Sequence, residues 1–168
     1  MRPGLARPDA RGQAVVEFSL VIVVALVVLM AVLDVGRAVY GLGAVSNAAR
    51  VGGRTAIVNQ NGDDIRQKAA SLSVGLGVDA SPVACSAGTS TNPPTPTGPS
   101  GTCVEYRTTD LSGTCATIDL GCVAVVTTKW TYTPLTPLIG TVVGPIALTS
   151  TTRVPVESVC SGVGCPVP

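Results

Sequence analysis

The residues best placed to do chemistry lie near the N-terminus, where one acidic side chain enters a long apolar run. Glu17 is followed by a stretch that carries no charge as far as Leu33. A charge at the centre of a bilayer costs at least ~2.5–3.5 kcal/mol, and less near the edge, so this carboxylate requires a partner. If the chain were cut after Gly12, the new α-amino group on Gln13 would lie one helical turn from Glu17. The spacing therefore favours an ion pair between them, within one molecule or between neighbours.

Other constellations that could support catalysis are missing from the sequence. Because the chain has no histidine, it has neither a Ser-His-Asp triad nor a Cys-His pair. Asp63 and Asp64 are adjacent, but adjacent positions on a helix point apart, and Asp63 is expected to cap a short helix. Gly41 and Gly43 fall within a predicted helix and follow no strand, so they do not form a phosphate loop. We therefore predict that the protein is not an enzyme and uses no cofactor.

The cysteines all lie downstream of the apolar run, and their even number predicts disulfides formed in an oxidising compartment. A zinc site is disfavoured, because the sequence has no CxxC pair and no histidine. The sequence cannot choose among the possible pairings, but short polar loops favour Cys103 with Cys115 and Cys160 with Cys165. The full set of disulfide candidates is Cys85, Cys103, Cys115, Cys122, Cys160 and Cys165.

Length and composition predict one small domain attached to a membrane segment. The chain has 168 residues, a net charge of +1 and only 12% charged residues, which gives no indication of nucleic-acid binding. The apolar run from Ala14 to Leu33 covers ~30 Å as a helix, enough to cross a bilayer. Three arginines precede the run against one acidic residue, so the N-terminus is expected on the cytoplasmic side; three further arginines follow it and argue mildly for the reverse.

A long helix is expected to begin near Gln13 and to continue beyond the membrane to about residue 60. Asp34 and Arg37 are three positions apart on it and are expected to pair at the outer membrane edge. One face is rich in small residues, so a neighbouring backbone can approach closely. We expect this face to pack on the protein's own sheet, or, in its membrane-proximal half, on similar helices of neighbouring molecules. Its members are Ala31, Val35, Ala38, Leu42, Val45, Ala49, Gly52 and Ala56.

The rest of the chain predicts a short second helix and an antiparallel sheet of about three to four strands. Asn61 and Gly62 are expected to end the long helix, and the second helix should bury Ile65, Ala69 and Leu72. Residues 87–102 are rich in Pro, Thr, Ser and Gly and predict an exposed loop. Strands are expected near 82–85 and 104–108, and over 122–132 and 146–156, with a wide connection from 133 to 145. Alternation along 122–132 predicts one face with Ala124, Val126, Trp130 and Tyr132 and the other with Val125, Thr127, Lys129 and Thr131. This is an α+β fold.

Several segments in order resemble the TadE-like proteins of the tight-adherence pilus machinery. They are the Gly12–Gln13 and Glu17–Phe18 pairs, the apolar run, residues 34–38 (DVGRA), residues 47–50 (NAAR) and residues 132–140 (YTPLTPLIG). The likeness covers roughly Arg11 to Ala56 and Val123 to Val156. It implies a pseudopilin or minor pilin that assists assembly or secretion of a pilus of the Flp type.

The resemblance also implies roles for the N-terminal residues. A membrane-embedded prepilin peptidase would cut between Gly12 and Gln13, and Glu17, with the aromatic Phe18 beside it, would guide assembly by pairing with an N-terminal amine. The implied organisation is a cytoplasmic leader (1–12), a transmembrane helix (13–35), its continuation (36–60) and an extracytoplasmic disulfide-containing domain (61–168). The implied partners are the peptidase, other pilin-like subunits, the tight-adherence machinery and membrane lipid of the bacterial inner membrane.

Two other classes of protein remain open from the sequence. One is an unprocessed single-pass signal-anchor protein whose outer domain binds a ligand or a partner. The other is a secreted protein cut at a small-x-small site such as Gly36–Arg37–Ala38. The apolar run is longer than the usual ~7–15-residue core of a signal peptide, which counts against secretion.

Overall fold

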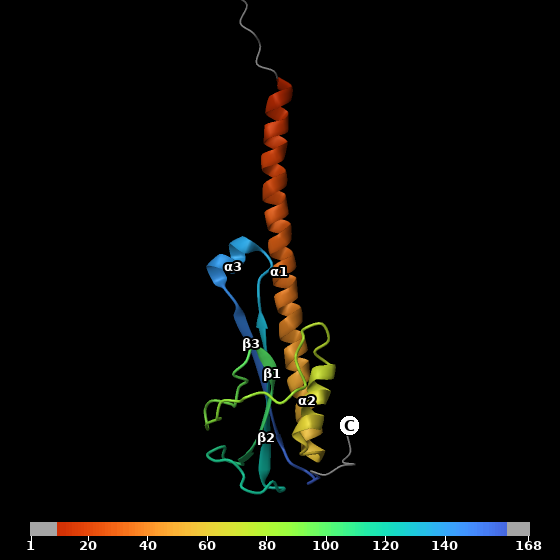
Figure 1. The fold of residues 1–168 in the computed structure, drawn as a ribbon, viewed down its shortest axis with the longest axis vertical. Helices are drawn as coiled ribbons and strands as arrows, with labels where there is room; N and C mark the ends of the chain where they lie inside the picture. Colours follow the sequence, from red (N-terminus) through yellow and green to blue (C-terminus); the bar gives the residue numbers. More distant parts are fainter. Residues whose placement is uncertain (1–9, 161–168) are drawn as a thin grey trace, which may run out of the picture.

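One long helix forms the axis of the molecule, and everything else is packed around its C-terminal half. The computed structural model describes residues 10–160, and helix α1 (Ala10–Val58) accounts for 49 of them. At about 1.5 Å per residue, α1 is about 73 Å long. Its N-terminal half stands clear of the domain, while α2 and the sheet flank the other half (Figure 1). The predicted α+β architecture is confirmed; the predicted leader, residues 1–12, lies largely outside the described residues.

Helix α2 (Gly62–Ser71) returns antiparallel to the end of α1 and covers one side of it. Its N-cap is Asn61, whose side chain accepts a hydrogen bond of 3.0 Å from the backbone N–H of Asp63. The predicted capping by Asp63 is therefore wrong, because the helix begins two residues earlier than expected. Ile65 and Ala69, on the predicted apolar face, are buried, whereas Leu72 is 40% exposed.

Three antiparallel strands form the sheet in the order β1–β2–β3. They are β1 (Ser100–Thr108), β2 (Cys122–Tyr132) and β3 (Ile146–Pro155). The predicted strand near 82–85 does not form, since Cys85 makes only an isolated bridge with Pro96. In contrast, β1 begins within the predicted loop 87–102, and Thr102 is buried there with its hydroxyl 3.1 Å from that of Thr128.

The wide connection between β2 and β3 contains a helix that the sequence analysis did not predict. Helix α3 (Pro137–Val143) begins with a proline in its first turn, where the missing N–H is not needed, and its C-cap is Gly144 with φ +69°. It lies at the end of the sheet nearest the N-terminal half of α1 (Figure 1).

The sheet packs on α1 through glycines and alanines, which allow the two backbones to approach closely. A Cβ added at Gly52 would lie 3.0 Å from Cγ1 of Val126, and one at Gly53 would lie 2.7 Å from Cγ2 of Thr152. Likewise, a Cβ at Gly41 would overlap the ring of Trp130. The predicted small-residue face is thus confirmed as an intramolecular contact over the C-terminal half of α1.

The membrane-proximal part of that face does not pack on the sheet. Val35 and Leu42, which were expected to pack on the protein's own sheet or on other pilin-like helices, are 62% and 50% exposed, so only the second alternative stays open for them. The buried positions are Asp34 and Gly41, one residue earlier on the helix. The physical reason is that the sheet approaches this part of α1 with the bulky Trp130 and Tyr132, which need a glycine and a polar partner opposite them.

Two disulfides hold the loops to the sheet. Cys85 is bonded to Cys103, and Cys115 to Cys122. The predicted Cys103–Cys115 pair is wrong, because Cys103 lies in the middle of β1, opposite Thr127, whereas Cys115 lies beyond the end of that strand. No cysteine among the described residues is free. The predicted partner of Cys160, Cys165, lies outside the described residues.

The face of the sheet opposite α1 is covered by the segment between α2 and β1. The Lys129 ammonium donates to the carbonyl of Pro96 at 3.0 Å, and the Thr131 hydroxyl donates to that of Pro99 at 2.7 Å. The predicted alternation along β2 is therefore confirmed, with Lys129 and Thr131 away from α1. Because both faces are covered, β2 is the central and most buried strand.

We predict that Gly53→Ala destabilises the folded protein by about 1–3 kcal/mol, because the added methyl group would clash with Thr152. The matched control is Gly43→Ala, where the Cβ meets no atom within 4 Å; this change should be neutral or stabilise by up to about 1 kcal/mol through helix propensity. Chemical unfolding in detergent micelles, followed by the fluorescence of Trp130, measures both. Equal stability of the two variants would contradict the close packing described here.

Candidate functional site

The predicted processing and assembly residues lie together at the exposed start of α1. The helix begins at Ala10, three residues earlier than the predicted start at Gln13. The Gly12–Gln13 bond therefore lies in its first turn. Gln13 and Glu17 are four positions apart and share a face. Both are exposed, Phe18 is 67% exposed, and a Cβ at Gly12 would meet no atom within 4 Å. The whole segment is thus accessible to a partner.

Glu17 has no partner within the part of the chain that the structure describes. No hydrogen bond or ion pair joins its carboxylate to another residue in 10–160. Ser19, two positions further on, instead bonds its hydroxyl to the carbonyl of Val16 at 2.8 Å, which removes the need for an outside partner. The carboxylate of Glu17 is therefore free to pair with a group from another molecule or with a new N-terminus.

The half of α1 that follows Glu17 is suited to cross a membrane. It is long and apolar enough to do so, and none of its most apolar window is buried in the structure. Large apolar side chains are exposed all around it, from Val15 to Leu33. A helix that is apolar on every side and packed against nothing needs an apolar surrounding.

Asp34 marks the point where α1 first meets the domain, and its carboxylate is buried there. Oδ1 accepts hydrogen bonds of 2.9 Å from the hydroxyl of Tyr132 and from the backbone N–H of Leu135. Oδ2 accepts one of 3.0 Å from the backbone N–H of Thr136 and another from its hydroxyl. The side chain of Asp34 is only 5% exposed. This junction, the Asp34 junction, ties α1 to the chain between β2 and α3.

Arg37 contributes to the Asp34 junction from its solvent side. Its Nη1 lies 4.0 Å from Oδ1 of Asp34, and its guanidinium carbon lies 5.9 Å from the centre of the Tyr132 ring. The predicted Asp34–Arg37 pair is therefore present, but it is the longest contact of the carboxylate. Burial, together with the hydrogen bond to Asp34, raises the pKa of Tyr132. The tyrosine thus remains a hydrogen-bond donor at neutral pH.

Sequence reasoning named Asp34 and residues 132–136 separately and missed that they meet. The hydrogen bonds at the junction join residues 98 to 102 positions apart. The available signal was that the two segments, DVGRA at residue 34 and YTPLTPLIG at residue 132, both carry the family resemblance. Two polar segments that flank apolar stretches at the same membrane edge are natural hydrogen-bonding partners.

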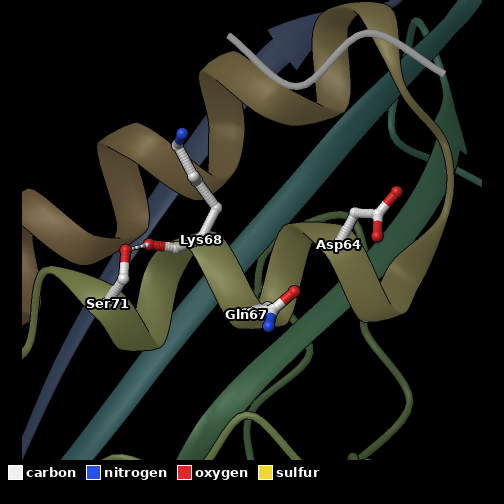
Figure 2. Close-up of a pocket in the computed structure, with 4 residues that line it drawn as sticks. All are labelled: Asp64, Gln67, Lys68 and Ser71. Atoms are coloured by element: carbon white, nitrogen blue, oxygen red, sulfur yellow. Dashed lines mark hydrogen bonds between the residues drawn. The ribbon is translucent and has the colours of Figure 1, made fainter. Parts of the chain in front are cut away.

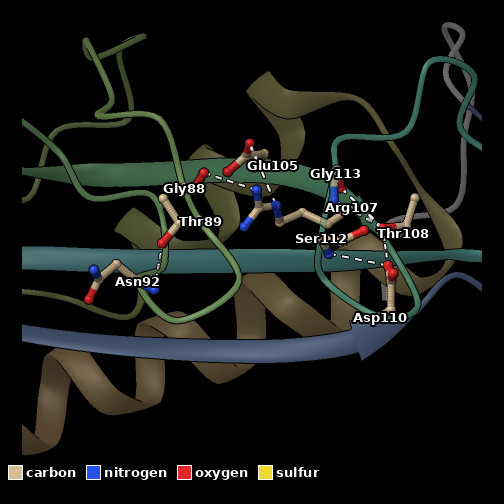
Figure 3. A network of polar contacts seen from close by, with 9 residues as sticks. All are labelled: Gly88, Thr89, Asn92, Glu105, Arg107, Thr108, Asp110, Ser112 and Gly113. Carbon is tan, nitrogen blue, oxygen red and sulfur yellow. Dashed lines mark hydrogen bonds and ion pairs between the residues drawn. The ribbon is translucent and has the colours of Figure 1, made fainter.

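A second polar group lies on the far face of the sheet and stabilises the loops (Figure 3). Arg107 is buried and donates to the carbonyl of Gly88 at 2.9 Å, with its Nε 3.9 Å from a carboxylate oxygen of Glu105. In the neighbouring turn, the hydrogen bonds from the hydroxyl of Thr108 and from Ser112 lower the pKa of Asp110 to about 2. These contacts join β1 to the neighbouring loops, and we assign them a structural role.

A shallow hollow on the domain surface lies along α2 (Figure 2). It has a volume of about 390 Å³ and is lined by Asp64, Gln67, Lys68 and Ser71. The carboxylate of Asp64 accepts a hydrogen bond of 2.8 Å from Asn59, which links α2 to the end of α1. Within residues 10–160 no group of side chains is arranged to hold a metal ion.

Comparison with known proteins supports the resemblance at the N-terminal end. Residues 12–54 match the family model described as TadE-like protein. The match confirms the resemblance to this family over a segment that includes the Gly12–Gln13 bond, the apolar run and Asp34. No curated protein matches the chain. No solved structure matches it either.

We predict that Asp34→Asn destabilises the domain by about 1–3 kcal/mol, because one acceptor oxygen is replaced by an N–H₂ group that faces buried donors. The matched control is Asp63→Asn, at an exposed carboxylate paired with Arg66, which should change stability by no more than about 0.5 kcal/mol. Chemical unfolding of both variants in micelles gives the comparison. Similar midpoints would mean that the Asp34 junction contributes little.

Proposed function

We propose that this protein is a TadE-like pseudopilin or minor pilin that assists assembly or secretion of a tight-adherence pilus. The observation that carries the proposal is the coincidence of three features within the matched residues 12–54. An exposed Gly–Gln bond, an unpaired Glu17 and a fully exposed apolar helix occur in this order on one continuous α1. In this proposal the protein is a structural component with no catalytic role and no cofactor.

Processing at the Gly12–Gln13 bond is the first step of the proposed mechanism. A peptidase must bind its substrate in an extended form, so the first turn of α1 has to unwind. A glycine lowers helix stability by about 1 kcal/mol relative to alanine, and this turn has no tertiary contacts to compensate. Cleavage then gives a helix that starts with a charged amine, one turn before Glu17. That amine, or the amine of a neighbouring subunit, neutralises the carboxylate.

Lateral packing between helices is the second step. One stripe of α1 stays exposed from the end of the apolar run to the part alongside the domain, and its spacings alternate between four and three as in helix pairs. This stripe lies next to the buried face that contacts the sheet, so a neighbouring helix has access to it. Its members, each at least 50% exposed, are Val28, Val32, Val35, Val39 and Leu42.

The proposed orientation places the N-terminus in the cytoplasm and the domain outside the inner membrane. The arginines before the apolar run support it, and so do the disulfides, which form in oxidising compartments. The proposed partners are a prepilin peptidase, other pilin-like subunits and components of the tight-adherence machinery. The domain, with its covered sheet, would make the contacts outside the membrane.

An unprocessed signal-anchor protein is the second candidate, because it needs the same apolar helix and the same outer domain. It differs in retaining the leader. A secreted protein cut after Ala38 is less compatible with the structure, because the cut would separate Asp34 from the domain. The donors of Tyr132, Leu135 and Thr136 would then be left without their acceptor.

We predict that the protein extracted from its native membrane starts at Gln13. N-terminal sequencing and intact mass measure this directly. Gly12→Val should block processing, because a narrow peptidase site accepts only a small residue before the cut. The matched control is Gly36→Val, in the same helix with open space around it, which should be processed normally. A start at Met1 in the unaltered protein would favour the signal anchor, and a start near Val39 would indicate secretion.

We also predict that Glu17→Val leaves membrane insertion intact but lowers pilus production. Loss of an ion pair worth about 1.4 kcal/mol lowers the equilibrium constant for assembly about tenfold. The matched control is Ser19→Val, which removes a polar group whose hydrogen bond is satisfied within the helix. Pili are counted by electron microscopy, and insertion is checked by resistance to alkaline extraction. Normal pilus numbers with Glu17→Val would remove the assembly role.

A further inference from the structure

We infer that the connection between β2 and β3 is a second membrane contact, in which the α3 tip lies in the interface of the bilayer beside α1. The α3 tip is defined here by its exposed apolar side chains, Leu135, Val142, Val143 and Ile146. The inference deepens the proposed function and rests on one part of it, the membrane insertion of α1.

The register between α1 and β2 fixes the level of the α3 tip. The two elements run in opposite directions, with Val126 beside Gly52, Trp130 beside Gly41 and Tyr132 bonded to Asp34. The chain that leaves β2 therefore continues toward the N-terminal half of α1, where Figure 1 shows α3. Asp34 directly follows Leu33, the last residue of the uncharged run. The α3 tip consequently lies at the level where the membrane-spanning segment ends.

The chemistry of the α3 tip is that of a lipid-facing surface. Leu135 is 71% exposed, Val142 83% and Val143 53%. Between Lys129 and Arg153 the chain has no charged residue at all. The opposite end of the domain is different, because the β1–β2 connection carries Asp110 and Asp119. Exposed apolar side chains without any charge are thus concentrated at the end of the sheet that faces the membrane.

The apolar surface of the α3 tip is continuous with that of α1, which is why we assign it to lipid. A pocket of about 230 Å³ lies between them, and its lining joins Val35 and Ala38 of α1 to Val143 and Ile146. Asp34, Tyr132 and Pro134 complete its wall, and Tyr132 is an aromatic residue of the kind found at membrane interfaces. The half-exposed Arg37 lies at the same level, where a guanidinium can reach lipid headgroups. A bilayer that surrounds α1 therefore contacts exposed apolar side chains on both α1 and the α3 tip.

The membrane contact would set the orientation of the domain. A single helix fixes neither its tilt nor its rotation in the membrane, and both are set by additional contacts. With the Asp34 junction holding the α3 tip against α1, the protein touches the membrane at two points. The sheet and its covering loops are then held at a defined angle to the membrane surface.

Fluorescence of the full chain in liposomes tests this inference. Val142→Trp places a reporter in the α3 tip, and the lipids carry bromine atoms on the acyl chains close to the headgroups. We expect at least about twofold stronger quenching for this reporter than for a control, because interfacial side chains lie within ~5–10 Å of that boundary. The matched control is Leu120→Trp, an apolar residue that is 66% exposed at the opposite end of the domain. The unaltered chain gives the contribution of Trp130.

A tryptophan can itself favour the interface, so hydrogen exchange on the unaltered chain provides a second measurement. Amides of residues 138–144 should exchange more slowly in lipid nanodiscs than in a short-chain detergent, with no such change in residues 109–121. Equal quenching of the two reporters, or no protection of α3, would overturn the inference. So would protection that depends on the number of copies per liposome, because a second copy would then be the occupant.

Failure of this inference and failure of the proposed function give different results. If α1 does not span the membrane, alkaline extraction removes the protein from the liposomes. The proposed function and the inference about the α3 tip are then both wrong. If the protein resists extraction but the Val142→Trp reporter is not quenched, only the α3 contact is wrong.

Discussion

A single buried carboxylate, that of Asp34, determines how the domain is placed on its helix. Five hydrogen bonds reach Asp34, four of them to its side chain, from Tyr132, Leu135 and Thr136. Backbone N–H groups buried without an acceptor are costly, so the chain that follows β2 has to lie beside Asp34. The register of β2 along α1 and the level of α3 both follow from it.

The close contact between α1 and the sheet depends on a second constraint: one helix must be stable both in an apolar environment and against the sheet. Its first half carries large apolar side chains on every side, whereas its second half presents Gly41, Gly52 and Gly53 to the sheet. Glycines weaken a helix in isolation, and here packing against Trp130, Val126 and Thr152 compensates. The change from large to small residues along α1 therefore marks the boundary between the part that can face lipid and the part that supports the core.

Local patterns predicted the elements whose side chains alternate or repeat clearly. The long α1, the burial of Ile65 and Ala69 in α2, and the two faces of β2 all follow from spacing alone. The predictions that were wrong depend on long-range geometry. The pairing of Cys103 with Cys85 depends on how the loop crosses the sheet. The start of β1 at Ser100 depends on pairing with β2, because the local sequence of Ser, Gly and Thr predicts a loop. The donors to Asp34 could not be assigned from spacing, because they lie about 100 residues away.

The separation between Asp34 and its donors has a consequence for the order in which the protein is completed. Leu135 and Thr136 follow Asp34 by 101 and 102 residues. At roughly 5–20 residues per second, a ribosome needs about 5–20 s to make that length of chain. During this interval the carboxylate is at the end of the apolar helix with only Arg37 near it, and the sheet has no fixed place on α1. The Asp34 junction can therefore form only after residue 136 has been made, and a shortened product that ends before β2 would lack every donor to this carboxylate.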